Sequence, residues 1–422
     1  MPSDHSLAAI VVRASQVIRF QMRAIMLQQS GSIGCTMRKL VFSLLLVLTA
    51  IPARAEKPVS VDQIDQILAA TRGKSDGKIA DQLSGLQLTE RVSPATLARW
   101  MAEEPGNKTR EAITLLVDTS AFLNLPAAEI PSLPPPTREA QRLMLDQMVQ
   151  YVRDTTTRLP NFSATRETAH FEDIPQRQEI GAFTSASTRR GGGGQTQFIP
   201  ESYAFEPLHL VARYKSVVTY RDGGEVPAGE DARNKNKPTA PGLTTTGEFG
   251  NILIMVIADT HAHGVQWGHW EQGSSGQLAV FRYQVSEKDS SYVMDVPTRA
   301  GVERQHPAYN GEISIDPATG TIMRITVISM IKVQSQALEV KVLVEYAPVL
   351  IGKRAYICPV KGIASSKTSA VGPTTNVGAS SPPVRTELND VSFTDYHLFR
   401  GTARILPDTN SGTDTNPPAP SH

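Results

Sequence analysis

The sequence predicts an α+β protein in which a small N-terminal helical module precedes a curved antiparallel half-barrel sheet covered by helices. Three observations support this fold class. Residues 309–356 alternate between apolar and polar side chains with a period of two, as antiparallel strands with one buried face do. Residues 59–125 show helical periodicity instead. Residues 249–257 form a strongly apolar helical stripe, which needs a sheet to cover.

Composition limits the classes of partner. The chain has 422 residues and a net charge of +1, so its overall charge gives no reason to expect nucleic acid or an anionic membrane surface. Cys35 and Cys358 are the only cysteines, which excludes a disulfide framework. Cys358 lies at the end of a predicted strand with no base near it in sequence. We therefore expect a small core residue there and not a nucleophile.

The N-terminal region contains the pattern of a secretion signal. Met37-Arg-Lys39 is basic, about nine apolar residues follow, and Ala53-Arg-Ala55 has the small-x-small form of a cleavage site. The apolar run is too short for a permanent transmembrane helix. We expect residues 1–36 to precede the true start, residues 37–55 to be the signal peptide, and the mature chain, without a membrane span, to be periplasmic or extracellular. The alternative is that the apolar run is a buried core helix.

The first part of the mature chain, residues 56–125, is predicted to be a module of four short amphipathic helices. Ser93-Pro94 is typical of a helix start, with a capping side chain followed by proline at the first helical position. Asn107 begins a further helix. Residues 126–136 contain five prolines, which predicts a stiff linker and a domain boundary.

The second part, residues 137–406, is predicted to be the half-barrel, and the tail at 407–422 is predicted to be disordered from its composition. A helix is expected from Thr137, and its apolar face consists of Leu143, Met144, Met148, Tyr151 and Val152. Strands are expected at 162–171, 203–220, 265–271, 278–285 and 391–405. Long loops are expected at 221–241 and 364–383.

Two local signals are sharper than the rest. Asp316-Pro-Ala-Thr-Gly320 predicts a tight reversal between strands, because proline fixes φ and glycine allows a positive φ. Thr245 and Glu248 have the spacing of a capping box, which predicts a helix start. The apolar residues behind this box recur at helical spacing: Phe249, Ile252, Leu253, Val256 and Ile257.

The order of elements from residue 137 to about residue 406 resembles that of the periplasmic lipoprotein-carrier superfamily. The residues that carry the resemblance are Leu159-Pro-Asn-Phe162, the run from Gly311 to Ile322, and Val344-Glu-Tyr-Ala-Pro-Val349. These sequence segments also resemble those of secreted bacterial proteins in which a carrier-like module follows a small helical one. The resemblance implies a half-open antiparallel barrel covered by helices that binds lipids, acylated proteins or regulatory partners, and it implies no catalytic residue.

One run of residues suggests metal chemistry. Asp259-x-His261-x-His263 looks like the first metal-binding strand of amidohydrolases, in which two imidazoles on one strand face bind zinc. Its context favours histidines at a helix end, because the residues before it have helical periodicity. The residues after it predict a β-meander, whereas amidohydrolases are (β/α)₈ barrels of about 250 residues. A metal-dependent hydrolase is therefore the alternative function.

A glycine run and a group of aromatic residues each allow a functional and a purely structural interpretation. Gly191–Gly194 beside two arginines is either a phosphate loop or a flexible hairpin tip, and the absence of a following Lys-Ser/Thr favours the tip. Trp267, Trp270 and Tyr283 either line an apolar cleft or fill the core, and aromatic residues on strands favour the core. Scattered Ser, Asp and His residues indicate no catalytic triad.

The function predicted from these observations is that of a secreted, non-catalytic protein without a cofactor. Its half-barrel would hold an apolar ligand or a partner segment between the sheet and the helix at 249–257. A curved sheet filled by its own side chains is the structural alternative. The predicted partner is a lipid or acylated ligand, or else an envelope protein, in which case the chain is an interaction or regulatory module. No catalytic, metal-binding or ligand-lining residue is assigned.

Overall fold

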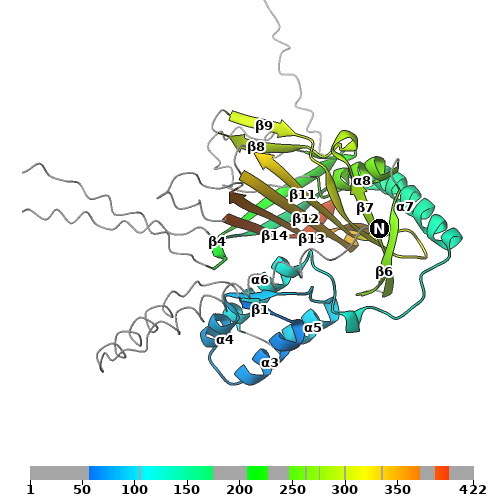
Figure 1. The fold of residues 1–422 in the computed structure, drawn as a ribbon. Coiled ribbons are helices and arrows are strands. Elements are labelled where there is room, and N and C mark those ends of the chain that lie inside the picture. The colour runs from blue at the N-terminus through cyan, green and yellow to red at the C-terminus, as the bar shows by residue number, and fades with distance from the viewer. Residues whose placement is uncertain are drawn as a thin grey trace, which may run out of the picture. The chain divides into compact units, whose positions relative to one another are not determined.

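The protein is described here from a computed structural model (Figure 1). The structure describes residues 57–103, 106–173, 207–226, 247–261, 264–274, 276–298, 301–333, 336–370 and 385–398. All of them belong to one compact unit, Glu56–His422. The predicted signal peptide, the glycine run at 191–194 and the C-terminal tail lie outside the described residues.

The first part of this unit is a helical module. Its elements are β1 (Lys57–Val59), α3 (Val61–Thr71), α4 (Asp76–Leu83), β2 (Leu86–Leu88), α5 (Pro94–Ala102) and α6 (Asn107–Ser120), with a 3-10 turn, η1 (Ala127–Glu129), after them. The start of α5 is as predicted, because the Ser93 side chain accepts a hydrogen bond from the amide of Thr96 at 3.2 Å. The parallel pair β1 and β2 was not predicted, since three residues are too few to show a period of two.

A large antiparallel sheet follows. Its ten strands, in sequence order, are β3 (Phe162–Glu172), β4 (His209–Arg221), β5 (Gly224–Val226), β6 (Gln266–Gly273), β7 (Gly276–Val285), β10 (Tyr309–Ile315), β11 (Ile322–Val333), β12 (Gln336–Ile351), β13 (Arg354–Ala370) and β14 (Arg385–Leu398). Their spatial order is β5-β4-β3-β14-β13-β12-β11-β10-β7-β6, so the sheet is open. The remaining elements are α7 (Arg138–Arg158), α8 (Asn251–His261), the turn η2 (Glu287–Asp289) and a hairpin of β8 (Met294–Thr298) and β9 (Gly301–Gln305).

The antiparallel run predicted at 309–356 is confirmed as β10 to β13, with the tight turn at Asp316–Gly320. The loop predicted at 364–383 is wrong in its first part, because β13 continues to Ala370. Residues there pair with β12 on one side and β14 on the other, and this pairing supplies the backbone hydrogen bonds that the Ser/Thr-rich composition did not predict. The closing strand also begins earlier than predicted, at Arg385.

Three further predictions are corrected. The loop predicted at 221–241 contains the short strand β5, which pairs with β4. Helix α8 begins at Asn251, later than the apolar stripe predicted from Phe249, because Gly250 has a non-helical φ of 156°; Thr245 of the predicted capping box lies outside the described residues. Leu143 was assigned to the apolar face of α7, but its side chain is 59% exposed.

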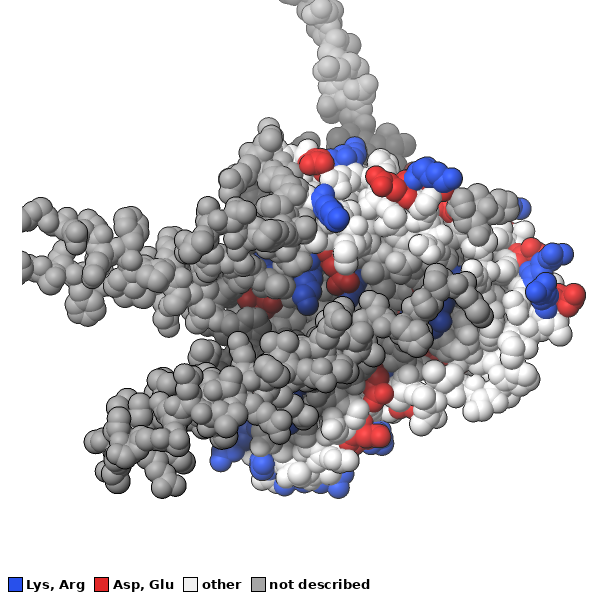
Figure 2. Space-filling model, viewed as in Figure 1, with Lys and Arg blue, Asp and Glu red and all other residues white. Residues whose placement is uncertain are grey.

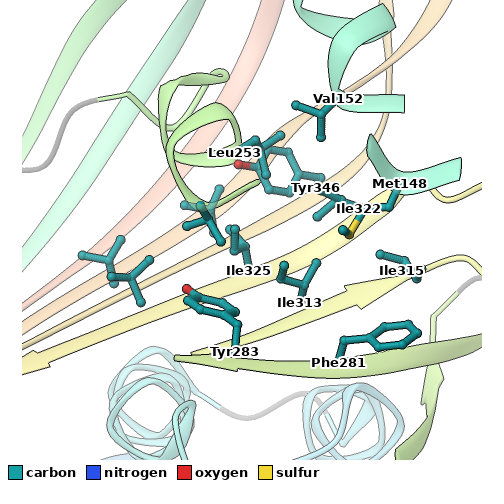
Figure 3. Close-up of a cluster of buried hydrophobic side chains, with 14 of the residues drawn as sticks. Met148, Val152, Leu253, Phe281, Tyr283, Ile313, Ile315, Ile322, Ile325 and Tyr346 are labelled. Atoms are coloured by element: carbon teal, nitrogen blue, oxygen red, sulfur yellow. The ribbon is translucent and has the colours of Figure 1, made fainter. Parts of the chain in front are cut away.

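The main core lies between the sheet and the two helices α7 and α8. Figure 3 shows Met148 and Val152 from α7 and Leu253 from α8 directed toward the strands. The side chains of β7, β10 and β11 that they meet are fully buried, as the alternation predicted. The helical module lies against the other face of the sheet, where it forms ion pairs with Glu271 of β6 and Lys361 of β13.

Candidate functional site

The predicted ligand site was the space between the sheet and the apolar helix. The structure places this helix, α8, over the sheet. Leu253 and Val256 of α8 are 4% and 0% exposed and belong to the same cluster as Phe281, Ile313 and Ile325 of the sheet (Figure 3). The described side chains fill this space by packing on one another. The result is a continuous apolar floor under α8.

Polar interactions hold both ends of α8. Near its C-terminus, the buried Asp259 carboxylate accepts hydrogen bonds from the Tyr309 hydroxyl at 2.7 Å and from the amide of Ser291 at 2.8 Å. At the other end, the Tyr346 hydroxyl donates to the carbonyl of Glu248 at 3.1 Å. Burial and the Asp259 charge raise the pKa of Tyr309, so its hydroxyl stays a donor at neutral pH. The middle of the helix is held by apolar contacts.

The Asp-x-His-x-His run is only partly described. Asp259 is engaged with Tyr309 and Ser291 as above. His261 is the last residue of α8, as its context predicted, while its side chain and the whole of His263 lie outside the described residues. Within the described ranges, no group of three or more His, Cys, Asp or Glu side chains is placed to hold a metal ion.

The other candidate residues are part of the core. Cys358 is completely buried, and burial raises the pKa of its thiol to about 12, as expected for a core residue. The rings of Trp267 and Trp270 pack edge to face at 4.8 Å, and Trp267 also meets Phe281 at 5.5 Å. Tyr283 is buried and donates its hydroxyl to the carbonyl of Thr326. The packing interpretation of these aromatic residues is confirmed.

Sequence reasoning missed a buried charge cluster between the helical module and the sheet. Arg91 of the module and Arg324 of β11 both make two hydrogen bonds to the carboxylate of Glu271 on β6, at 2.8 to 3.3 Å. All three side chains are less than 9% exposed. Burial opposes the charge of Glu271, but the neighbouring His269 and Arg91 side chains outweigh it and lower its pKa. No local sequence signal predicts contacts between residues so far apart.

A second buried pair joins the same two parts of the chain. Asp118 of α6 accepts a hydrogen bond from Lys361 of β13 at 2.5 Å, and Lys361 also lies 3.5 Å from Asp390 of β14. Asp118 is completely buried, which raises its pKa to about 7. Burial lowers the pKa of Lys361, but the charge of Asp118 outweighs this and raises it above its ordinary value. Lys361 is therefore charged whenever Asp118 is.

Two open cavities lie on this charged face of the sheet. One, of about 660 Å³, lies over β6, β7, β10 and β11 and beside the end of α6. The other, of about 470 Å³, lies between the helices α4 and α6 and strands on the β3 side of the sheet. On the surface that Figure 2 shows, the charged side chains of described residues form small groups in which basic and acidic residues lie near one another.

Comparisons of the chain with protein-family models, with curated proteins and with solved structures gave no significant match. The resemblance to lipoprotein carriers stays a prediction from the residues quoted in the sequence analysis. Among the described residues, no helix has the length and apolar character needed to cross a bilayer.

Proposed function

We propose that this is a secreted, non-catalytic envelope protein whose open sheet is a half-barrel of the lipoprotein-carrier type. Its ligand is an acyl chain or an apolar partner segment, bound on the sheet face that α8 covers. The observation that supports this proposal is the way in which α8 is held. Polar bonds hold its two ends, through Asp259 and Glu248, while only apolar contacts hold its middle over a continuous apolar floor.

An apolar ligand can replace the contacts that α8 makes. Hydrophobic contact is non-directional, so an acyl chain on the floor recovers the roughly 1.5–3 kcal/mol that burial of a side chain such as Leu253 or Val256 contributes. The hydrogen bonds at the ends of the helix have no such substitute. A hydrogen bond to a charged group contributes about 1.5–3 kcal/mol, so the Tyr309–Asp259 bond sets much of the free energy of opening.

A glycine with a positive φ lies on each side of α8. Gly250 precedes the helix with φ of 156°, and Gly264 follows it with φ of 77°. Both values belong to the region that favours glycine. We infer that α8 moves as a unit about these two residues when the ligand enters, and that the floor strands keep their register.

The first test is chemical. Purified protein is extracted with organic solvent and the extract is analysed for acyl chains by mass spectrometry, while the protein fraction is examined for a copurified polypeptide. Acyl chains in a fixed ratio to protein support the proposal. A copurified envelope protein without acyl chains would instead identify an interaction module. Stoichiometric zinc that is lost in His261→Ala would identify the metal-dependent hydrolase.

The second test addresses the helix itself, with a long-chain fluorescent fatty acid as the probe. Tyr309→Phe removes a bond that holds α8 closed, so the open fraction and the measured affinity rise together, by roughly 10- to 150-fold. Tyr283→Phe is the matched control, since it removes a buried hydroxyl from the same core without touching α8. Equal affinities of the two variants would overturn the proposal that α8 covers the site.

A further inference from the structure

The cleft over β6, β7, β10 and β11 has a lining unlike the rest of its sheet face. Its floor is two rows of side chains set by the strand register. One row runs from Gln266 through Arg282 to Glu312, and the next pairs Gln284 with Asn310. The wall is the end of α6, where Phe122, Leu123 and Asn124 line the cleft. Together they enclose about 660 Å³, within the range of small-molecule sites.

Four of the polar side chains that line the cleft are amides. Gln266, Gln284, Asn310 and Asn124 are all exposed, and their side chains make no hydrogen bond to another described residue. Each amide offers two N–H donors and a carbonyl acceptor. An aliphatic hydroxyl is also both a donor and an acceptor, so this set matches a ligand that presents several hydroxyls.

The charges of the cleft cancel. Arg282 donates from Nε to Glu312 at 3.1 Å, and the second oxygen of Glu312 lies 3.7 Å from Arg324. The same face of the sheet carries Lys341 and Lys361 a few strands away. On one face of the sheet, the lysines of β12 and β13 thus give way to uncharged amides at the cleft. We take this difference in side-chain type as the feature that sets the cleft apart from the rest of the solvent-exposed face.

The wall supplies an apolar surface opposite the amides. Leu123 is 38% exposed and Phe122 is half-buried, and both line the cleft. Ile328 of β11 adds a third partly exposed apolar side chain at the end of the Gln284–Asn310 row. A ligand that fits must present hydroxyls on one side and C–H groups on another. A sugar ring has both, and it carries no charge.

We propose that this cleft binds an uncharged oligosaccharide. The amides of Gln284, Asn310 and Gln266 bind its hydroxyls, and Phe122 packs against the C–H face of a ring. This site is distinct from the apolar face under α8, because it lies on the opposite side of the sheet. An envelope protein with both sites would bind an apolar ligand and a surface glycan independently.

The test is calorimetric titration of the purified protein with soluble oligosaccharides of glucose and of N-acetylglucosamine, at low and at high salt. We expect one of them to bind with little salt dependence, since no ion pair forms. Asn310→Ala and Gln284→Ala should each weaken binding roughly five- to thirtyfold through the loss of one or two neutral hydrogen bonds. Phe122→Ala should weaken it as well.

Gln272→Ala is the matched control, because Gln272 lies on β6 outside the cleft and should leave the affinity unchanged. The proposal fails if no neutral oligosaccharide binds at millimolar concentration, if only anionic glycans bind, or if the Asn310→Ala, Gln284→Ala double variant binds as the wild type does. Titration of the same variants with the fluorescent fatty acid separates the two sites. The cleft variants should bind the fatty acid as the wild type does. If the wild type binds no fatty acid, the acyl proposal fails and the oligosaccharide titration still tests the cleft.

Discussion

Arg91 donates two hydrogen bonds to Glu271, at 3.0 and 2.8 Å, although 180 residues separate them in the sequence. Arg324 approaches the same carboxylate and makes two more. One buried acid thus holds an arginine from the helical module and an arginine from the sheet. Because the geometry is bidentate on both sides, the contact fixes the orientation of the module as well as its position.

Glu271→Gln should destabilise the protein by about 3–5 kcal/mol, because it removes the carboxylate that pairs with both buried guanidinium groups, and Arg324 keeps only the more distant Glu312, at 3.7 Å. The measurement is the free energy of unfolding in denaturant. Asp295→Asn is the control. It breaks a solvent-exposed pair with Arg304 on the hairpin of β8 and β9, and it should change the free energy of unfolding far less than Glu271→Gln does. Equal losses in the two variants would show that the Glu271 cluster adds little to the attachment of the module.

Asp118 should make stability depend on pH. Burial raises its pKa from 3.8 to about 7, so the folded protein binds a proton there more tightly than the unfolded chain does. The stabilisation that Asp118 gains from this proton is complete below its ordinary pKa of 3.8 and is lost as the pH rises through about 7. Asp118→Asn binds no proton. The free energy of unfolding of the wild type, relative to this variant, should therefore fall by about 1–3 kcal/mol from about pH 5 to about pH 7.

Urea unfolding at several pH values measures this difference, and Asp81→Asn on α4 serves as the control for a carboxylate outside the buried pair. A difference between wild type and Asp118→Asn that stays constant, or that grows with pH, would contradict a raised pKa at Asp118.

Gly311→Ala should destabilise the sheet. A Cβ at this position would overlap the carbonyl oxygen of Thr326 on β11 and would lie 2.7 Å from the Tyr283 hydroxyl. The strands must then separate, at a cost of about 1–3 kcal/mol or more. Gly77→Ala on α4 is the matched control, since nothing lies within 4 Å of its Cβ. It should stabilise the helix by about 0.5–1 kcal/mol. Thermal unfolding of both variants gives the comparison.

The buried face of α7 can be tested with a pair of alanine variants. Met148 is 2% exposed, so Met148→Ala should cost about 2–5 kcal/mol through lost contacts and a cavity. Leu143 is 59% exposed, so Leu143→Ala should change stability by about 0.5 kcal/mol or less. If Leu143→Ala were as costly as Met148→Ala in denaturant unfolding, Leu143 would be buried, as the sequence predicted.

The same helix shows where sequence reasoning reached its limit. Apolar residues at helical spacing predicted α7 and most of its buried face, but Leu143 and Met144 are adjacent, and only packing decides which one of such a pair faces the sheet. In α8, the capping pattern at Thr245–Glu248 predicted the helix start. The helix instead begins at Asn251, after Gly250 with its non-helical φ of 156°, and a glycine in the sequence does not show which φ the fold will give it.

The sequence by itself determined the class of fold, the helices and the antiparallel run from β10 to β13, because hydrophobic periodicity and turn chemistry act between residues close in the chain. Only the tertiary structure decided which face of the sheet the helical module covers. That contact includes charged side chains such as Asp118 and Lys361, which are 243 residues apart, so only the folded chain brings them together.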